Sequence, residues 1–75
     1  MNKTVKDYEF KEILAHFLTV NNLTQKAFAD KINVKQSQVS EWLHGKAKPG
    51  YDSIKQMAIA FNISADYLLG LEEEF

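Results

Sequence analysis

The spacing of the apolar residues limits most what this chain can fold into. Near the start they recur at intervals of three and four residues, at Phe10, Ile13, Leu14, Phe17 and Leu18. The same spacing returns later, at Ile54, Met57, Ala58 and Phe61. Such intervals place side chains on one face of an α-helix, whereas a half-buried strand needs strict alternation. Both segments are therefore predicted to be amphipathic helices, and no strand is expected.

Residues that favour helix ends divide the chain into short segments. Thr24 and Ser64 are good N-cap residues, because their hydroxyl oxygens can accept a bond from the first turn of a helix. Asn33 readily takes the left-handed conformation, and Gly45 suits the position after a helix end, with Pro49 barring continuation. We predict an all-α domain spanning 1–75, with helices over about 7–21, 25–32, 36–44, 51–61 and 65–69 and a loosely ordered tail over 71–75.

Composition excludes several classes of protein. A chain of 75 residues has room for one domain with a small core. It has no cysteine, which excludes disulfides and thiolate metal ligands and fits a reducing compartment. It lacks an apolar run long enough for a membrane span and an apolar N-terminal block typical of a signal peptide. We therefore expect a cytoplasmic protein that does not bind a membrane.

Charge is distributed unevenly along the chain. The total is −1, which by itself does not suggest a polyanionic partner. Residues 24–50, however, carry five lysines against Asp30 and Glu41, a net charge of +3. Residues 51–75 carry one lysine against five acidic residues, a net charge of −4. The positive charge is thus concentrated around the helix predicted over 36–44.

The helix predicted over 36–44 has two unlike faces. Val39, Trp42 and Leu43 share one face, and the opposite face carries Gln36, Ser37, Ser40, Glu41 and His44. A short connection joins it to the helix over 25–32, which is the layout of a helix-turn-helix motif. Side chains of this kind suit the edges of DNA bases: Gln pairs with adenine, Ser with several bases, and Glu accepts from cytosine.

The stretch "LTQKAFADKINVKQSQVSEWLHGKAKPGYDSIKQMAIAFNISADYLLG", residues 23–70, resembles the Cro/repressor, or xenobiotic-response-element, family of helix-turn-helix domains. The shared signals, all at the family's spacing, are Leu23-Thr24-Gln25, Phe28-Ala29, Val39 with Trp42, Gly45-Lys46, Pro49, "MAIAFNIS" and Leu68-Leu69. The resemblance implies a five-helix lambda-repressor-like fold.

The resemblance also implies roles for individual residues. Base-reading positions are matched by Gln36, the principal reader, and by Ser37, Glu41 and Lys35. Phosphate-contacting positions are matched by Thr24, Gln25, His44, Lys46 and Lys48. Core support of the motif falls to Leu18, Phe28, Val39, Trp42 and Leu43. Other interpretations stay open, since Glu41 is more often a solvated charge than a base reader, and lysines in a loop can serve solubility alone.

Three features depart from the family's pattern. Lys35 stands where Ser or Thr is usual, so a capping hydroxyl worth about 1 kcal/mol is missing. Leu18 and Leu43 replace an Arg and a Glu that often form a buried ion pair. An apolar pair avoids the desolvation cost of buried charges, so the exchange should be neutral or stabilising. Gly50 replaces a residue that is often a polar cap, which weakens the start of the helix over 51–61.

The leading hypothesis is a sequence-specific regulator of transcription that binds double-stranded DNA, like a prophage repressor or Cro. It is expected to act as a homodimer, formed mainly on DNA, on an inverted repeat with A·T-leaning half-sites. Apolar surface for pairing is expected from Leu68, Leu69, Leu71 and Phe75. The alternative is an antitoxin or adaptor that works through a protein partner, which the net charge and the acidic tail favour slightly.

No enzymatic activity is expected. The sequence shows no Ser/His/Asp set, no glycine-rich phosphate loop and no paired catalytic carboxylates. His16 and His44 lie far apart along the chain, with no carboxylate at ligand spacing, so neither a metal site nor a cofactor is predicted.

Overall fold

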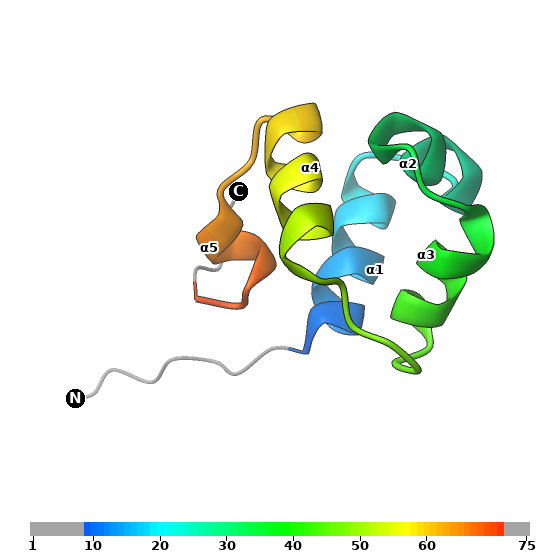
Figure 1. Ribbon diagram of the computed structural model, residues 1–75, viewed down its shortest axis with the longest axis horizontal. Coiled ribbons are helices and arrows are strands. Elements are labelled where there is room, and N and C mark those ends of the chain that lie inside the picture. Colours follow the sequence, from blue (N-terminus) through cyan, green and yellow to red (C-terminus); the bar gives the residue numbers. More distant parts are fainter. Residues whose placement is uncertain (1–8, 72–75) are drawn as a thin grey trace.

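The computed structural model describes residues 9–71, and these fold into helices alone (Figure 1). The helices are α1 (Phe10–Val20), α2 (Gln25–Ile32), α3 (Gln36–Leu43), α4 (Tyr51–Phe61) and α5 (Ala65–Leu68). The described part of the chain contains no strand, which confirms the all-α class. None of the helices in this part is both long and apolar enough to cross a membrane.

Several helix ends differ from the predicted ones. The first helix was predicted to include residue 9, and this is wrong. Glu9 has an extended backbone and is the N-cap of α1. The Glu12 carboxylate accepts a hydrogen bond from the Glu9 N–H at 3.0 Å and so closes this end. At the other ends, Asn21, His44 and Leu69 are C-caps, so α1, α3 and α5 each stop one residue early. The expectations for residues 7, 8 and 72–75 lie outside the described residues.

The remaining helix ends follow the capping chemistry of their residues. The Thr24 hydroxyl accepts from the Ala27 N–H at 3.0 Å, and the Ser64 hydroxyl accepts from the first turn of α5. Asn33 and Gly45 take positive φ angles of 63° and 73°, as their residue types indicate. Asn62 ends α4 in the same way, with φ 54°, although no helix end was predicted from this residue.

Aromatic rings hold three of the helices together. The Phe28 ring of α2 stacks on the Phe61 ring of α4, with centroids 5.0 Å apart. Phe17 of α1 meets Phe61 edge-on at 5.2 Å. Around these rings the buried core is completed by Ile13, Leu14, Leu18, Ala29, Ile32, Val39, Trp42, Met57, Tyr67 and Leu68. Every helix therefore contributes to one continuous core.

Leu68 belongs to this core and is only 3% exposed, so the expectation that it supplies surface for pairing is wrong. It packs inward because α5 is a single short turn held against α1 and α4. Leu69 and Leu71 lie beyond that turn and are exposed, at 58% and 63%. Phe75 lies outside the described residues.

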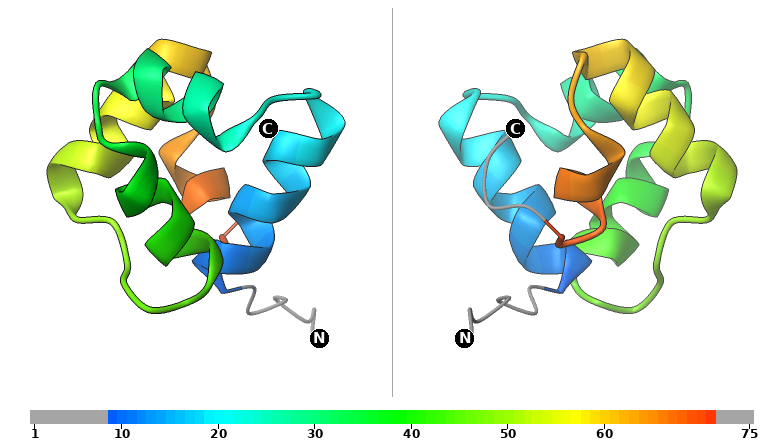
Figure 2. Two further views of the ribbon diagram at one scale, coloured as in Figure 1. Left: turned by 90° about the vertical axis from the view of Figure 1, so that its right-hand side faces the viewer. Right: turned by 90° about the vertical axis from the view of Figure 1, so that its left-hand side faces the viewer.

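The helices place the motif on one side of the molecule. α2 packs on α3 and α4, while α1 packs on α3 and α5. In Figure 1, α2 and α3 lie at the right and α5 at the left, with α1 and α4 between them. The left panel of Figure 2 looks onto α2 and α3, and the right panel looks onto the side that carries α5. The two motif helices thus lie together on one side of the domain.

Candidate nucleic-acid interface

The turn between α2 and α3 is fixed by backbone hydrogen bonds. Asn33 takes the left-handed conformation, and the next residue, Val34, donates its N–H to the Ala29 carbonyl at 3.0 Å. The chain therefore leaves α2 sharply, and half-buried Val34 packs against the core. Lys35 is extended and becomes the N-cap of α3. The result is a pair of short packed helices joined by a tight turn.

The two faces of α3 differ as its sequence predicts. Val39 and Trp42 are 0% and 2% exposed and anchor the helix in the core. Four predicted contact residues face solvent on the other side, namely Gln36, Ser37, Glu41 and His44. Since neutral side chains predominate among them, this face offers hydrogen-bond donors and acceptors more than charge.

The N-terminal end of α3 lacks a side-chain cap. Lys35 occupies the N-cap position, and its side chain makes no bond to the first turn. The capping hydroxyl missing from the sequence is therefore missing from the structure as well. The Lys35 side chain is exposed and extends from the start of the exposed face of α3. A cation is thus placed beside Gln36 at the cost of a capping bond.

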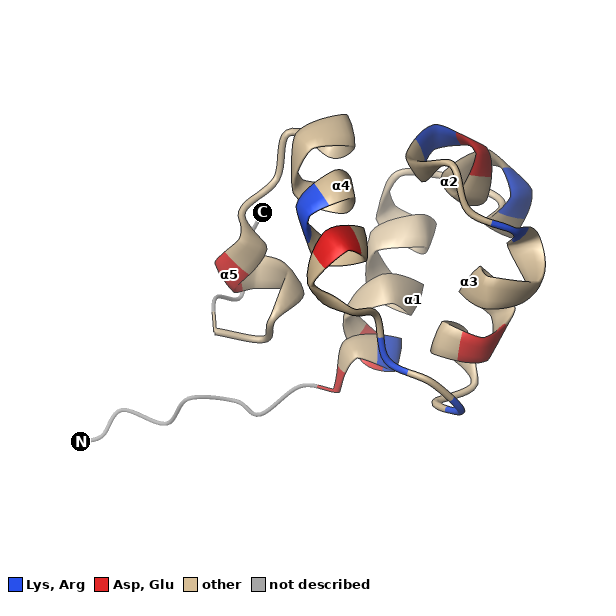
Figure 3. Cartoon of the chain, viewed as in Figure 1, with Lys and Arg blue, Asp and Glu red and all other residues tan. Residues whose placement is uncertain are grey.

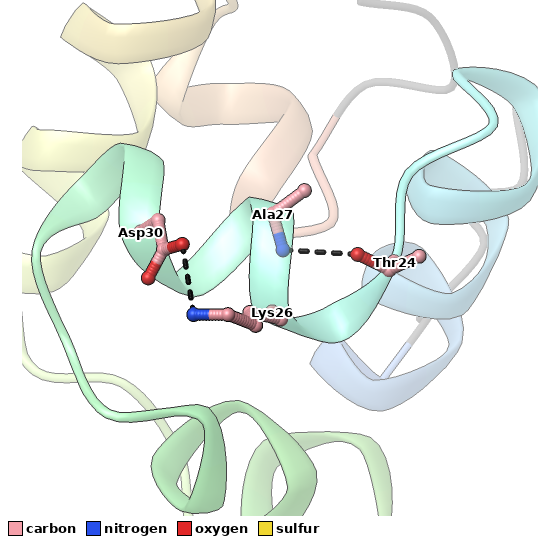
Figure 4. A network of polar contacts seen from close by, with 4 residues as sticks. All are labelled: Thr24, Lys26, Ala27 and Asp30. Atoms are coloured by element: carbon pink, nitrogen blue, oxygen red, sulfur yellow. Dashed lines mark hydrogen bonds and ion pairs between the residues drawn. The ribbon is translucent and has the colours of Figure 1, made fainter.

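The N-terminal end of α2 is capped, unlike that of α3. The Thr24 oxygen accepts from the Ala27 N–H, and its hydroxyl hydrogen can still donate to an outside acceptor (Figure 4). Gln25 follows as a half-buried residue. Lys26 is 3.2 Å from the Asp30 carboxylate, an exposed pair one turn apart that balances its charge locally (Figure 4).

The C-terminal end of α3 fixes the orientation of an imidazole. The Nδ1 atom of His44 lies 2.7 Å from the Ser40 carbonyl oxygen. A carbonyl oxygen only accepts, so Nδ1 carries the hydrogen and donates it. The other ring nitrogen, Nε2, is therefore an acceptor in neutral His44 and a donor in the charged form.

Lysines follow in the loop between α3 and α4. Lys46 and Lys48 are both exposed. The Lys48 ammonium lies 3.9 Å from a carboxylate oxygen of Glu9, at the start of α1. Lys48 therefore forms an exposed ion pair with a residue that is distant in the sequence. Figure 3 shows basic residues on α2, before α3 and in the loop after it, whereas the described part of α5 shows only an acidic one.

This geometry agrees with the comparisons with known proteins. The sequence profile of the helix-turn-helix family, of the Cro/C1 type, matches residues 21–68 and so covers α2 to α5. The chain belongs to the helix-turn-helix family. No solved structure matches it significantly.

Two curated relatives share this helix-turn-helix domain. The chain is 37% identical over 65 residues to the HTH-type transcriptional activator BcrR of Enterococcus faecalis. That alignment covers 87% of this chain and 32% of the relative. It is 34% identical over 50 residues to the HTH-type transcriptional regulator ImmR of Bacillus subtilis (strain 168), covering 67% of this chain and 39% of that protein. The chain thus spans less than two fifths of the length of either relative.

The helix-turn-helix domain has a depression beside α3 that the sequence did not indicate. It measures about 290 Å³ and is lined by Val34, Lys35, Ser37, Gln38, Glu41 and Ser53. Ser53 comes from α4 and joins the predicted readers Ser37 and Glu41. Only tertiary packing brings it there, and no sequence pattern pointed to it. Ser53 is therefore an additional polar group at the edge of the α3 surface.

Away from the exposed face of α3, one titratable group of residues 9–71 has a shifted pKa. Within residues 9–71, no group of three His, Cys, Asp or Glu side chains is placed to hold a metal ion. Burial raises the pKa of the Tyr67 phenol, but Tyr67 is in the core and away from the exposed face of α3.

Proposed function

We propose that this helix-turn-helix domain binds double-stranded DNA in a sequence-specific manner and regulates transcription, as a prophage-repressor or Cro-like protein. The observation that carries the proposal is the outward face of α3, where Gln36, Ser37 and Glu41 are exposed above the buried Val39 and Trp42. A helix of this kind fits the major groove of B-DNA. The names of the two relatives, a transcriptional activator and a transcriptional regulator, support the same class of function.

In this proposal, α3 reads bases and the surrounding residues bind the backbone. Gln36 pairs with adenine through N6 and N7, and Ser37, Glu41 and Lys35 make further contacts in the groove. Backbone phosphates are bound by Thr24, Gln25, His44, Lys46 and Lys48. Two of these side chains already have a partner within the domain. The Thr24 oxygen accepts from the Ala27 N–H but can still donate its hydroxyl hydrogen, and the Lys48 ammonium lies 3.9 Å from a Glu9 carboxylate oxygen.

One copy reads too few base pairs for useful specificity, so the proposed DNA-binding unit is a homodimer on an inverted repeat. Exposed Leu69 and Leu71, which follow α5, supply apolar surface for pairing. The free dimer is expected to be weak and to form mainly on DNA.

The test is selection of binding sites from random DNA duplexes, followed by titration of the selected duplex at several salt concentrations. A recovered inverted repeat, with log K falling linearly against log salt, is the expected result. The same titration with Gln36→Ala separates base reading from phosphate binding. No retention of any duplex at low salt would overturn the proposal and favour an antitoxin or adaptor that acts through a protein partner.

A further inference from the structure

The Lys11 side chain passes over Gly45, the residue that follows the C-cap of α3. Lys11 lies in the first turn of α1 and is exposed. A Cβ atom built on Gly45 would lie 3.1 Å from Lys11 Cδ and 3.5 Å from its ammonium nitrogen, Nζ. The Lys11 side chain therefore runs over Gly45, and its ammonium group lies where the basic loop begins. Glycine at position 45 allows both this approach and the positive φ of 73°.

Buried packing fixes this arrangement. Phe10, the residue before Lys11, meets the Trp42 ring edge-on, with centroids 6.1 Å apart and planes at 90°. Trp42 is 2% exposed, so the contact anchors the first turn of α1 against the C-terminal half of α3. Lys11 is thereby held beside the C-terminal end of α3, although it is more than thirty positions away from Gly45 in the sequence.

The same turn of α1 changes the charge of the loop in two ways. Glu9 lies 3.9 Å from Lys48 and offsets part of its positive charge. Lys11 brings an ammonium group next to Gly45, between His44 and Lys46 in the chain. The cations on this edge of the domain therefore come from two separate segments, the first turn of α1 and the loop after α3.

We propose that Lys11 is a further phosphate-binding residue of the domain, contacting the DNA backbone next to the sites of His44 and Lys46. The inference rests on the proposed function, because it extends the same DNA-binding surface. A lysine at this place adds affinity without sequence preference, since each phosphate that it neutralises releases condensed counterions.

A purely structural role makes a different prediction. The alkyl chain of Lys11 packs on Gly45, and an ammonium group near the end of a helix interacts favourably with the last carbonyl groups. In that case, loss of the charge would lower the stability of the domain and leave DNA binding unchanged. Lys11→Met separates the two roles, because it keeps most of the alkyl chain and removes only the charge.

The experiment is a gel-shift titration of a random-sequence duplex over a series of salt concentrations. It compares wild type, Lys11→Met, Lys11→Gln, Lys11→Arg and a matched control, Lys55→Met, which removes an exposed lysine of α4. We expect both neutral variants of Lys11 to bind about three- to ten-fold more weakly at low salt, with a salt slope smaller by about 0.9 per bound chain. Lys11→Arg and Lys55→Met should keep the wild-type slope.

The outcomes are distinguishable. If wild type binds with a measurable slope and the neutral variants of Lys11 share that slope, the inference about Lys11 is wrong and the proposed function stands. If wild type binds no duplex at any salt concentration, both fail. Circular dichroism melts of each variant show whether it is folded, and a folded Lys11→Gln with wild-type DNA affinity overturns the inference even if Lys11→Met unfolds.

Discussion

Gln36 is the residue on which proposed base reading depends most. Its amide is exposed at the start of α3, and Gln is suited to pair with N6 and N7 of adenine. We predict that Gln36→Ala binds the selected operator about 1–3 kcal/mol more weakly and loses its preference at one base pair of each half-site. The chain has no arginine, the commonest reader of guanine, so the half-sites should lean toward A·T pairs.

Lys46→Ala is the comparison for this measurement. It should weaken operator and random duplex alike and reduce the salt slope, because a phosphate contact carries no sequence information. Both variants should be titrated against the operator and its single-base variants. Equal weakening of operator and random duplex by Gln36→Ala would contradict base reading and leave α3 as a surface for phosphates alone.

Tyr67 links burial to alkaline stability. Burial raises the pKa of its phenol, because the charged form is poorly solvated in the core. An unfolded tyrosine titrates near 10, so above about pH 10 the unfolded chain releases a proton that the folded chain retains, and stability falls. Tyr67→Phe should remove this loss. Urea melts of both proteins at about pH 9 and about pH 11 test it, and an equal loss in both would contradict the prediction.

At the scale of the helix, α3 begins with a lysine at its N-cap. Lys35→Ser should supply the missing capping hydroxyl and raise the free energy of unfolding by about 1 kcal/mol. If Lys35 lies beside the wall of the groove, the same change should weaken DNA binding. Thermal melts of Lys35→Ser should therefore show a higher stability, and titrations of the same variant should show a lower DNA affinity. Lys55→Ser, within α4, is the control and should not gain stability.

The packing of α1 on α3 predicts coupling between Leu18 and Leu43. Leu18 is buried and Leu43 is half-buried against the same core. Leu43→Glu alone should cost about 2 kcal/mol, because the carboxylate loses solvent on one side and has no cationic partner. Leu18→Arg should recover part of this cost in the double variant. Melts of the two single variants and the double variant form a cycle, and simply additive effects would exclude a direct contact.

Local chemistry accounts for what was predictable at this scale. The apolar spacing and the caps Thr24, Asn33 and Ser64 indicate where α2, α4 and α5 begin or end, since capping depends on neighbouring residues alone. Glu9 was not anticipated as an N-cap, because its role depends on the carboxylate of Glu12. The approach of Lys11 to Gly45 and that of Glu9 to Lys48 depend on how α1 packs, which residue spacing does not specify.

At the scale of the whole molecule, pairing on DNA should use the exposed apolar residues that follow α5. Leu69→Lys combined with Leu71→Lys should bind the inverted repeat no more tightly than a single half-site, because charges replace the exposed apolar surface. Val20→Lys, which alters a similarly exposed apolar residue of α1, is the matched control. Footprinting should show half-sites about one helical turn apart, and a single unpaired half-site would contradict the dimer.

The burial of Trp42 has an optical consequence. It is the chain's only tryptophan, it is 2% exposed, and it lies directly beneath the face proposed to enter the groove. Native protein should therefore emit at short wavelength, and its emission should shift to the red when α3 leaves the core. Because the indole is covered by its own helix, DNA bound to the opposite face should leave that emission nearly constant. The intrinsic fluorescence of this protein thus reports whether α3 is folded, independently of whether DNA is bound.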